Sequence, residues 1–336
     1  MPILNFPEDY FTNEIRCDFY ITAMMKRLWA SQMEILAWID AKCNEHDIRY
    51  IVFNGSMLGA IRHKGFIPWD DDIDIAMLRE DYVKFTKVLE KELPPYLKTK
   101  SLMPGAIQPK EMIFNIGNGG KLDTSPEFLE RFHGCPYATG IDIFVHDKMT
   151  KDPQEFAYQD RLIRMLDRLL TLRWKVDDST IMGDELNEYG KLKRVIEQEL
   201  GYTFTDNEAV SLQILRLIDA ASSLCDDCDS DRVAVMQDML YTGDRGMCER
   251  HFTDRIYVPF ENVMSIPVPK DYDEVLRNFF GDYNVFVMGA AGHNYPIYQF
   301  QRIDLYKAYK QRGWKIPEEF LEYDENGRLV LDPATV

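Results

Sequence analysis

The sequence predicts an α+β protein in which a mixed β-sheet is flanked by helices and carries a helical insertion. Three observations support this fold class. Two short apolar stretches, 72–77 and 141–145, alternate with aspartate, as strands with one buried face do. Apolar residues at helical spacing lie between and around these strands. A long run of helical patterns from about residue 153 to 226 is more than the sheet requires.

The first 46 residues are expected to form an N-terminal helical segment. Thr12 can cap a long helix, or a pair of helices, that continues to about Glu45. The apolar positions of this segment include Ile15, Tyr20, Met24, Leu28, Ile35 and Ile39. The core domain is then expected over residues 47–150.

The core begins with a unit suited to phosphate. Residues 50–63, YIVFNGSMLGAIRH, predict a strand, a turn and a short helix from Met57. Gly55 in the turn lets a ligand approach the backbone closely, and Ser56 offers a hydroxyl at the helix start. A helix N-terminus presents free N–H groups and a partial positive charge, which favour phosphate. By itself the pattern is most often only a helix cap, so its meaning depends on the segment that follows.

That segment, FIPWDDDIDIAM at 66–77, places four aspartates within five positions. Asp72 and Asp74 share one strand face, roughly 6.5–7 Å apart. Two carboxylates on a rigid strand suit a divalent cation such as Mg²⁺, which takes oxygen ligands. A solvated acidic loop is the alternative, but such a loop rarely continues as an Ile-Asp-Ile strand. A calcium-binding loop would need glycine at Ile75 and glutamate at Asp81, so it is excluded.

A third carboxylate and several cations complete the candidate site. Asp142 repeats the Ile-Asp-Ile context in TGIDIFVHD at 139–147, although an edge-strand aspartate facing water is the alternative. Arg62 and His63 follow the short helix, where a cation would neutralise phosphate charge. Lys121 follows a glycine-rich turn and could reach the same phosphates. Helix-dipole compensation for the basic residues and plain surface exposure for Lys121 stay open.

The run NGSMLGAIRHKGFIPWDDDIDIAMLREDYVKF closely resembles the LicD family of bacterial cholinephosphotransferases. GIDIF downstream and VPKDYDEVLRNFFGDY near the C-terminus extend the resemblance to about residues 28–290. Fukutin and fukutin-related protein share the catalytic motif of this family. The resemblance implies a nucleotidyltransferase fold related to polymerase beta. It also implies a CDP-linked alcohol donor, a glycan or lipid-linked glycan acceptor, and a Mg²⁺ or Mn²⁺ cofactor.

The resemblance assigns roles position by position. Asp72 and Asp74 match the metal-binding pair, and Asp142 matches the third acidic residue. Gly55 and Ser56 match the phosphate loop of the fold. The implied reaction moves a phospho-alcohol, typically phosphocholine, to a glycan hydroxyl and releases CMP.

Some points of the implied mechanism stay open. Either Asp142 or Asp70 could be the general base. Transfer of the nucleoside monophosphate itself is a second hypothesis on the same fold. An inactive binding module is a third, disfavoured because all three acids are present. After GDY the chain lacks the Pro-Pro pair of the family and has His293 as its histidine in this segment, which is compatible with a different headgroup or acceptor.

Residues 151–250 are expected to form a mainly helical insertion, 251–300 the C-terminal part of the LicD-like domain, and 301–336 a tail. RVAVMQDML at 232–240 and RIYVPFENVMSIPVP at 255–269 predict strands. A zinc-compatible spacing, C-x2-C-x19-C-x2-H, is formed by Cys225, Cys228, Cys248 and His251. The alternative is that these thiols never meet.

Composition narrows the partners and the compartment. With 39 basic and 56 acidic residues, the net charge of −17 disfavours nucleic acid as a partner. No apolar run approaches the roughly 20 residues of a membrane-spanning helix, and the N-terminus lacks the pattern of a signal peptide. Six cysteines in a chain of 336 residues do not suggest a disulfide framework. We therefore expect a cytoplasmic enzyme, with a peripheral position at the inner membrane face as a further possibility.

Overall fold

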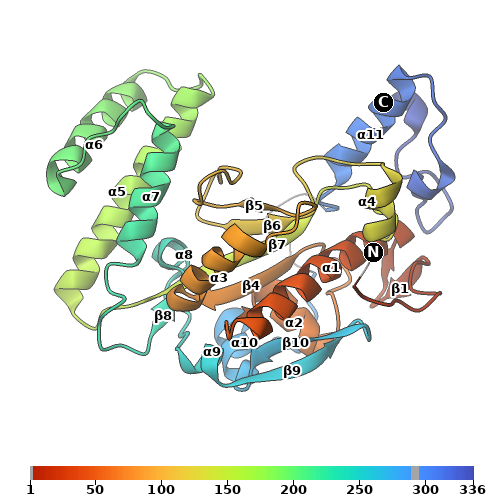
Figure 1. The fold of residues 1–336 in the computed structure, drawn as a ribbon, viewed down its shortest axis with the longest axis horizontal. Coiled ribbons are helices and arrows are strands. Elements are labelled where there is room, and N and C mark those ends of the chain that lie inside the picture. Colours follow the sequence, from red (N-terminus) through yellow and green to blue (C-terminus); the bar gives the residue numbers. More distant parts are fainter. Residues whose placement is uncertain (1–2, 289–294) are drawn as a thin grey trace.

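A mixed β-sheet lies at the centre of the computed structural model, which describes residues 3–288 and 295–336 (Figure 1). In spatial order its strands are β3 (Ile51–Val52), β4 (Ile73–Leu78), β7 (Gly140–Lys148), β6 (Phe114–Gly117) and β5 (Lys98–Lys100), with β8 (Val233–Ala234) pairing with the end of β7. Neighbours β4 and β7 run parallel, and the other neighbouring pairs are antiparallel. The α+β class with a mixed sheet flanked by helices is confirmed.

Helices surround this sheet and bury one of its faces. They are α1 (Ala23–Glu45), α2 (Asn54–Arg62), α3 (Arg79–Glu92), α4 (Pro126–Arg131), α9 (Arg250–Thr253), α10 (Tyr272–Phe280) and α11 (Gln299–Gln311). Tyr82 of α3 stacks on Phe114 of β6 with ring centroids 4.9 Å apart. Ile75 and Ile143 lie in the same row as Phe114, so α3 covers the face that these apolar residues form. Side chains of the alternate positions point to the opposite face.

The N-terminal segment differs from its prediction. Residues before α1 form a β-hairpin of β1 (Glu14–Arg16) and β2 (Phe19–Ile21), so a helix starting at Thr12 is wrong. Positions 17–18 adopt positive φ angles, which a continuing helix excludes. Thr22 is the true cap, because its hydroxyl accepts a hydrogen bond from the backbone N–H three residues later.

Two local predictions need correction in the rest of the chain. Helix α2 begins at Asn54, three residues before the predicted Met57, so the Gly-Ser pair lies inside its first turn. The stretch 232–240 contains only the short strand β8 and continues as helix α8 (Met236–Thr242). Met236, Met239 and Leu240 are buried, so their helical spacing outweighs the β-branched residues before them.

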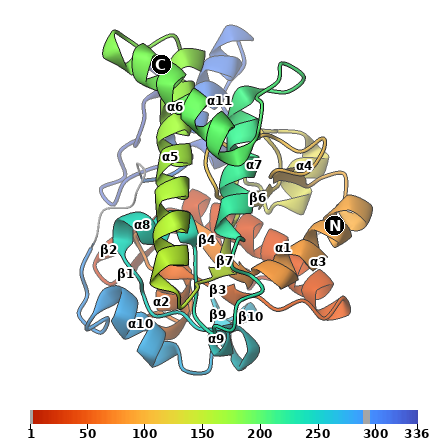
Figure 2. The ribbon, with the colours of Figure 1, turned by 90° about the vertical axis from the view of Figure 1, so that its left-hand side faces the viewer.

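The segment between β7 and β8 builds a second hydrophobic core. Its helices are α5 (Pro153–Asp177), α6 (Asp184–Leu200) and α7 (Val210–Ser222). Figures 1 and 2 show α5 and α7 side by side, projecting beyond the central sheet. Apolar residues of these helices pack with those of α8 in a cluster separate from the main core. Asp152 starts α5 by accepting hydrogen bonds from two backbone N–H groups, and Gly201 ends α6 in the left-handed conformation.

The C-terminal part returns to the main core. The strand prediction for residues 255–269 is confirmed by β9 (Arg255–Phe260) and β10 (Met264–Pro269), which pair as a hairpin. Beyond α11 come two short 3₁₀ turns, Glu318–Phe320 and Pro333–Thr335. Leu305, Tyr306 and Phe320 all belong to the main hydrophobic core, so residues 301–336 pack against the domain. Within the described ranges, none of the helices is long and apolar enough to cross a bilayer.

Candidate active site

Two of the predicted acids face each other across adjacent strands. In the parallel pair of β4 and β7, Asp74 is the register partner of Asp142. Both side chains point to the sheet face opposite Phe114, and adjacent strands lie about 4.8 Å apart. Asn115 of β6 donates a 2.7 Å hydrogen bond to Oδ1 of Asp142. Asn54, at the start of α2, donates to Oδ2 of Asp74 at 3.2 Å. The site is therefore a polar row built across the sheet.

The remaining acids form a loop that enters β4. One carboxylate oxygen from each of Asp70, Asp71 and Asp72 lies within 4.8 Å of the others, a spacing that could hold a metal ion. Helix α1 fixes this loop, because Trp29 donates to the carbonyl of Asp70 and Gln32 to that of Asp71. Asp71 is fully buried, and one oxygen of its carboxylate accepts the amide N–H of residue 297 at 2.7 Å.

Burial and like charge act together on these acids. Desolvation is the largest cause that raises the pKa of Asp70, Asp74 and Asp142 above the usual value. The charge of Asp72 raises all three further. For Asp142 the hydrogen bond from Asn115 and the charge of Lys100 oppose the shift. Carboxylates crowded in this way attract a cation, which would stabilise their ionised forms.

The Gly-Ser pair lies directly against these acids. A Cβ on Gly55 would approach Oδ2 of Asp70 to 2.7 Å, so glycine is needed for this contact. The buried Ser56 accepts the backbone N–H of Asp74 through its hydroxyl oxygen at 2.9 Å. This contact ties α2 to β4 and leaves the hydroxyl hydrogen to donate. The sequence placed both residues in the site, and the structure brings them to its acidic row.

A pocket of about 350 Å³ opens beside Gly55 and Asp70. Its wall is mainly apolar and includes Trp69, Phe280, Tyr283, Val285 and Val287. Arg62 also lines it and donates to the carbonyl of Tyr283 at 2.9 Å. The guanidinium lies 4.8 Å from the ring centre of Phe286. Arg62 thus joins α2 to the C-terminal wall of the pocket.

His63 lies behind Arg62 and is not a second cation. The Nε of Arg62 donates to Nε2 of His63 at 2.9 Å, which leaves the ring proton on Nδ1. Burial, followed by the charge of Arg62, lowers the pKa of His63 to about 4. The ring is neutral near pH 7, and its Nδ1 lies 3.9 Å from Sγ of Cys17.

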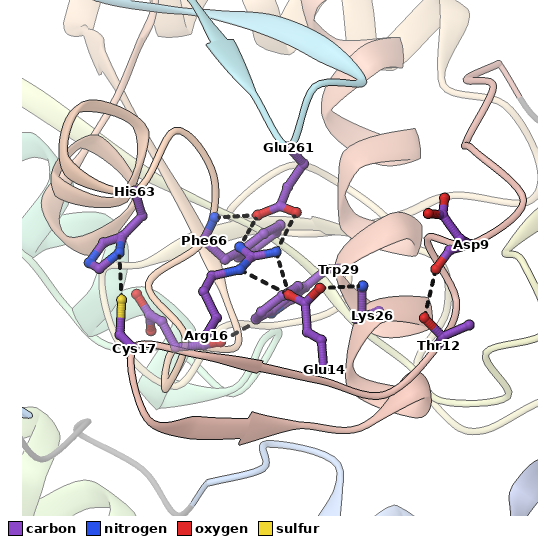
Figure 3. A network of polar contacts seen from close by, with 11 residues as sticks. Asp9, Thr12, Glu14, Arg16, Cys17, Lys26, Trp29, His63, Phe66 and Glu261 are labelled. Atoms are coloured by element: carbon purple, nitrogen blue, oxygen red, sulfur yellow. Dashed lines mark hydrogen bonds and ion pairs between the residues drawn. The ribbon is translucent and has the colours of Figure 1, made fainter.

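A network of ion pairs from the N-terminal hairpin holds the loop at residues 65–66, just before the aspartates (Figure 3). Arg16 lies between Glu14 and Glu261 and donates to both carboxylate oxygens of Glu261, at 2.7 and 3.1 Å. Glu261 also accepts the backbone N–H of Phe66 at 2.9 Å. A Cβ on Gly65 would overlap this carboxylate, at 2.0 Å from Oε1. The loop that leads into the aspartates is therefore held between two hairpins.

Lys121 lies apart from the other predicted phosphate ligands. It lines a separate pocket of about 510 Å³ with Lys98, Asn118 and two glycines, 119–120. The pocket next to Gly55 and Arg62 has none of these residues in its wall. The structure therefore brings together the predicted acids, Gly55, Ser56, Arg62 and His63, and leaves Lys121 on a neighbouring pocket.

Sequence reasoning missed three polar residues of the row: Asn54, Asn115 and Lys100. Asn54 directly precedes the Gly-Ser pair, so that pair could have indicated Asn54 as a site residue. Asn115 and Lys100 lie in the short strands FNIG and KTK, and no local pattern reveals that FNIG pairs with β7 or that KTK pairs with FNIG.

The cysteines and histidine with zinc spacing are not brought together. The Sγ of Cys228 contacts the carbonyl of Met149, and the Sγ of Cys248 contacts that of Gly246. Nδ1 of His251 accepts the backbone N–H of Cys248. Among the described residues, the compact groups of metal-ligand atoms do not include these four side chains.

Comparison with known proteins adds a second line of evidence. Residues 47–163 match the family model described as LicD/FKTN/FKRP, nucleotidyltransferase domain. Over 261 residues the chain is 24% identical to the lipopolysaccharide cholinephosphotransferase LicD of Haemophilus influenzae, covering 75% of this chain and 88% of that protein. An uncharacterized Rickettsia typhi protein is 35% identical over 79 residues, which is 21% of this chain and 26% of that protein. A Rickettsia prowazekii protein is 42% identical over 45 residues, 13% and 17% respectively.

Fold and site together define an α+β protein with a carboxylate site built across adjacent strands of a mixed sheet. Within that class, the chain belongs to the LicD family. This membership indicates a transferase.

Proposed function

We propose that this protein is a phosphotransferase that moves phosphocholine, or a related phospho-alcohol, from a CDP-linked donor to a glycan hydroxyl. The observation that carries the proposal is the register pairing of Asp74 with Asp142 beside the pocket of Gly55 and Arg62. The site lies in the part of the chain that matches the family model, 47–163. The choline headgroup and a lipopolysaccharide acceptor are suggested by the name of the Haemophilus relative.

We further propose a nucleotidyltransferase fold of the polymerase beta type for residues 47–150. Its support is the order strand, Gly-Ser helix, and a strand with two acids paired to a third acidic strand. Residues 151–250 would be the insertion and 251–300 the end of the LicD-like domain. The expectation of a cytoplasmic protein near the inner membrane face also stays a prediction.

Asp72, Asp74 and Asp142 would hold Mg²⁺ or Mn²⁺, with Asp70 as a further oxygen donor. The residues present fit such a cation, because all offer carboxylate oxygens and burial raises the pKa of Asp70, Asp74 and Asp142. When bound, the metal would neutralise negative charge on the diphosphate and on the leaving CMP. The rest of the mechanism depends on the residues of this chain.

The chain would position the donor and move one proton. The N–H groups at the start of α2, the hydroxyl of Ser56 and the guanidinium of Arg62 would bind phosphate oxygens. The acceptor oxygen attacks the distal phosphorus, its proton passes to a carboxylate, and the bond from that phosphorus to the CMP oxygen breaks. Asp142 or Asp70 would take the proton.

The helical insertion is proposed to shape the acceptor cleft. Gln108 and Lys110, in the loop between β5 and β6, are hydrogen-bonded to Ser211 of α7 and Trp174 of α5. Glu111 of the same loop lies close enough to Asp142 to raise its pKa. The insertion thus touches the loop that borders the acidic row.

The test is a screen of CDP-choline, CDP-ethanolamine, CDP-ribitol and CDP-glycerol for CMP release with Mg²⁺ and a glycan acceptor. We expect CMP release and an acceptor that gains the mass of the phospho-alcohol. Transfer of a nucleoside monophosphate is the second candidate, because the same acids would serve it. An acceptor that gains CMP or AMP in mass spectrometry would support that reaction and contradict the first.

A further inference from the structure

The acidic pair belongs to a longer polar row that crosses four strands. Asp74 pairs with Asp142, Asp142 with Asn115, and Asn115 with Lys100. Because register partners point to the same face, all four side chains lie on the face opposite α3. The row runs from carboxylates at one end to an amide and an ammonium at the other.

Two glycines, Gly117 and Gly140, leave the space that the side-chain amide of Asn115 occupies. A Cβ on Gly140 would come within 2.5 Å of its Oδ1, and a Cβ on Gly117 within 3.2 Å. Both approaches are tighter than side-chain contacts normally are. With the amide confined in this way, its N–H group reaches Oδ1 of Asp142 at 2.7 Å. The other oxygen of Asp142 takes no part in this hydrogen bond.

Lys100 is closer to the acidic row than Lys121 is, so it is the better candidate to bind an anionic ligand there. Its own charge acts on Asp142, whereas Lys121 lines the neighbouring pocket. Within the described ranges of the chain, Lys100 makes no ion pair. In a protein of net charge −17, a lysine so placed is available to an anionic ligand.

We propose that Asn115 is a positioning residue, which aims Asp142 at the metal, and that Lys100 binds the diphosphate of the donor. The proposal rests on the proposed function, since it assumes a metal-bound nucleoside diphosphate. It assigns two residues that sequence patterns did not suggest, and it replaces Lys121 with Lys100 as the phosphate-binding lysine.

The positioning role of Asn115 is tested by measuring Mn²⁺ affinity with electron paramagnetic resonance. Asn115→Leu keeps most of the side-chain volume but removes the amide, and Gly140→Ala displaces it. We expect both variants to weaken Mn²⁺ binding by about tenfold, as loss of an outer-shell partner does. Gly190→Ala in helix α6, where an added Cβ would make only an ordinary contact of 3.8 Å with Arg194, is the matched control. Wild-type Mn²⁺ affinity in Asn115→Leu would overturn the assignment, because a packing role alone would survive that change.

Calorimetric binding of CDP with Mg²⁺ tests the part of Lys100. Lys100→Ala should weaken binding by about tenfold, in line with one charge-assisted hydrogen bond. Lys100→Arg should restore most of the affinity. Lys121→Ala should change it by less than about twofold, as should Lys87→Ala, an exposed lysine of α3 on the other side of the sheet.

The outcomes separate the two proposals. If Lys100→Ala binds CDP as the wild type does, or if Lys121→Ala loses as much affinity, the assignment of Lys100 is wrong. If the wild type binds CDP but releases no CMP from any CDP-alcohol, only the proposed reaction is contradicted. A wild type that does not bind CDP contradicts both.

Discussion

Single carboxylates of the site oppose the stability of the fold. Asp74 is a register partner of Asp142, and the charge of Asp72 acts on both. Buried like charges destabilise the folded state until a cation or a proton compensates them. A residue whose presence lowers stability in this way needs a functional reason, which the proposed metal supplies.

The first prediction removes one charge at a time. Asp72→Asn and Asp74→Asn keep the side-chain shape, so both variants should fold, and without metal Asp74→Asn should melt no lower than the wild type. Activity should fall by about 100-fold or more, because metal stabilisation contributes several kcal/mol. CMP release and thermal melting measure the two effects. EDTA should abolish wild-type activity, and Mg²⁺ or Mn²⁺ should restore it. Full activity in either variant, or in EDTA, would exclude the metal assignment.

The second prediction concerns His146, which is buried near the rings of Phe53 and Phe252. Burial lowers its pKa to about 4. In the unfolded chain its pKa lies near 6.5, so that state takes up a proton first as the pH falls. The free energy of unfolding is therefore highest above pH 6.5, where His146 is neutral in both states. It falls by about 3 kcal/mol as the pH drops from 6.5 to 4. Urea unfolding should show a weaker pH dependence in His146→Phe. If His146→Phe loses as much unfolding free energy between pH 6.5 and 4 as the wild type does, another group is responsible.

At the scale of single residues, the sequence could predict those site residues that their neighbours in the chain mark out. Asp74 and Asp142 stand out because each lies between two isoleucines in a strand pattern, and Asp72 stands out because it is two residues before Asp74. Asn115 and Lys100 reach the site only through strand pairing, and that pairing depends on contacts distant in the chain. A short polar segment gives no sign of its register.

At the scale of elements, the β1–β2 hairpin is the clearest departure from the sequence-based expectation. Its apolar residues Ile15 and Tyr20 continue the spacing of α1, so periodicity alone favoured a long helix or a pair of helices. The turn at 17–18 and the cap at Thr22 decide against it. The hairpin brings Arg16 to Glu261, a contact between residues far apart in the sequence.

The third prediction tests this contact. Glu261 has 4% of its side chain exposed, and Glu261→Gln removes the charge that holds Arg16. The free energy of unfolding should fall by about 2 kcal/mol, the size of a hydrogen bond to a charged group. Urea denaturation measures it. Glu80→Gln is the control, because Glu80 pairs with Arg49 but is 62% exposed and should matter by less than about 0.5 kcal/mol. Equal losses in the two variants would contradict a special role for Glu261.

At the scale of the whole molecule, polar contacts join the two hydrophobic cores. Arg79 bonds Asp147 of β7 at 2.6 Å and Asp219 of α7 at 2.8 Å. The loop contacts of Gln108 and Lys110 add to this link. The helical character of the insertion could be predicted from its periodicity. Its separate core could not, because the sequence does not show which apolar faces meet.

The insertion also leaves and re-enters the sheet at one place. The register pairs Asp147 with Ala234 and Lys148 with Val233, so its two ends are hydrogen-bonded neighbours. A segment attached in this way resembles a cassette, which evolution can exchange while the framework that carries Asp142 keeps its register. If the insertion shapes the acceptor cleft as proposed, such an exchange would change the acceptor and leave the proposed donor site unchanged. The fourth prediction is that a chimaera with the corresponding segment of the Haemophilus relative keeps its CDP-alcohol preference and changes its acceptor in a glycan-labelling assay. A change of donor instead would show that the cassette and the framework evolve as one unit.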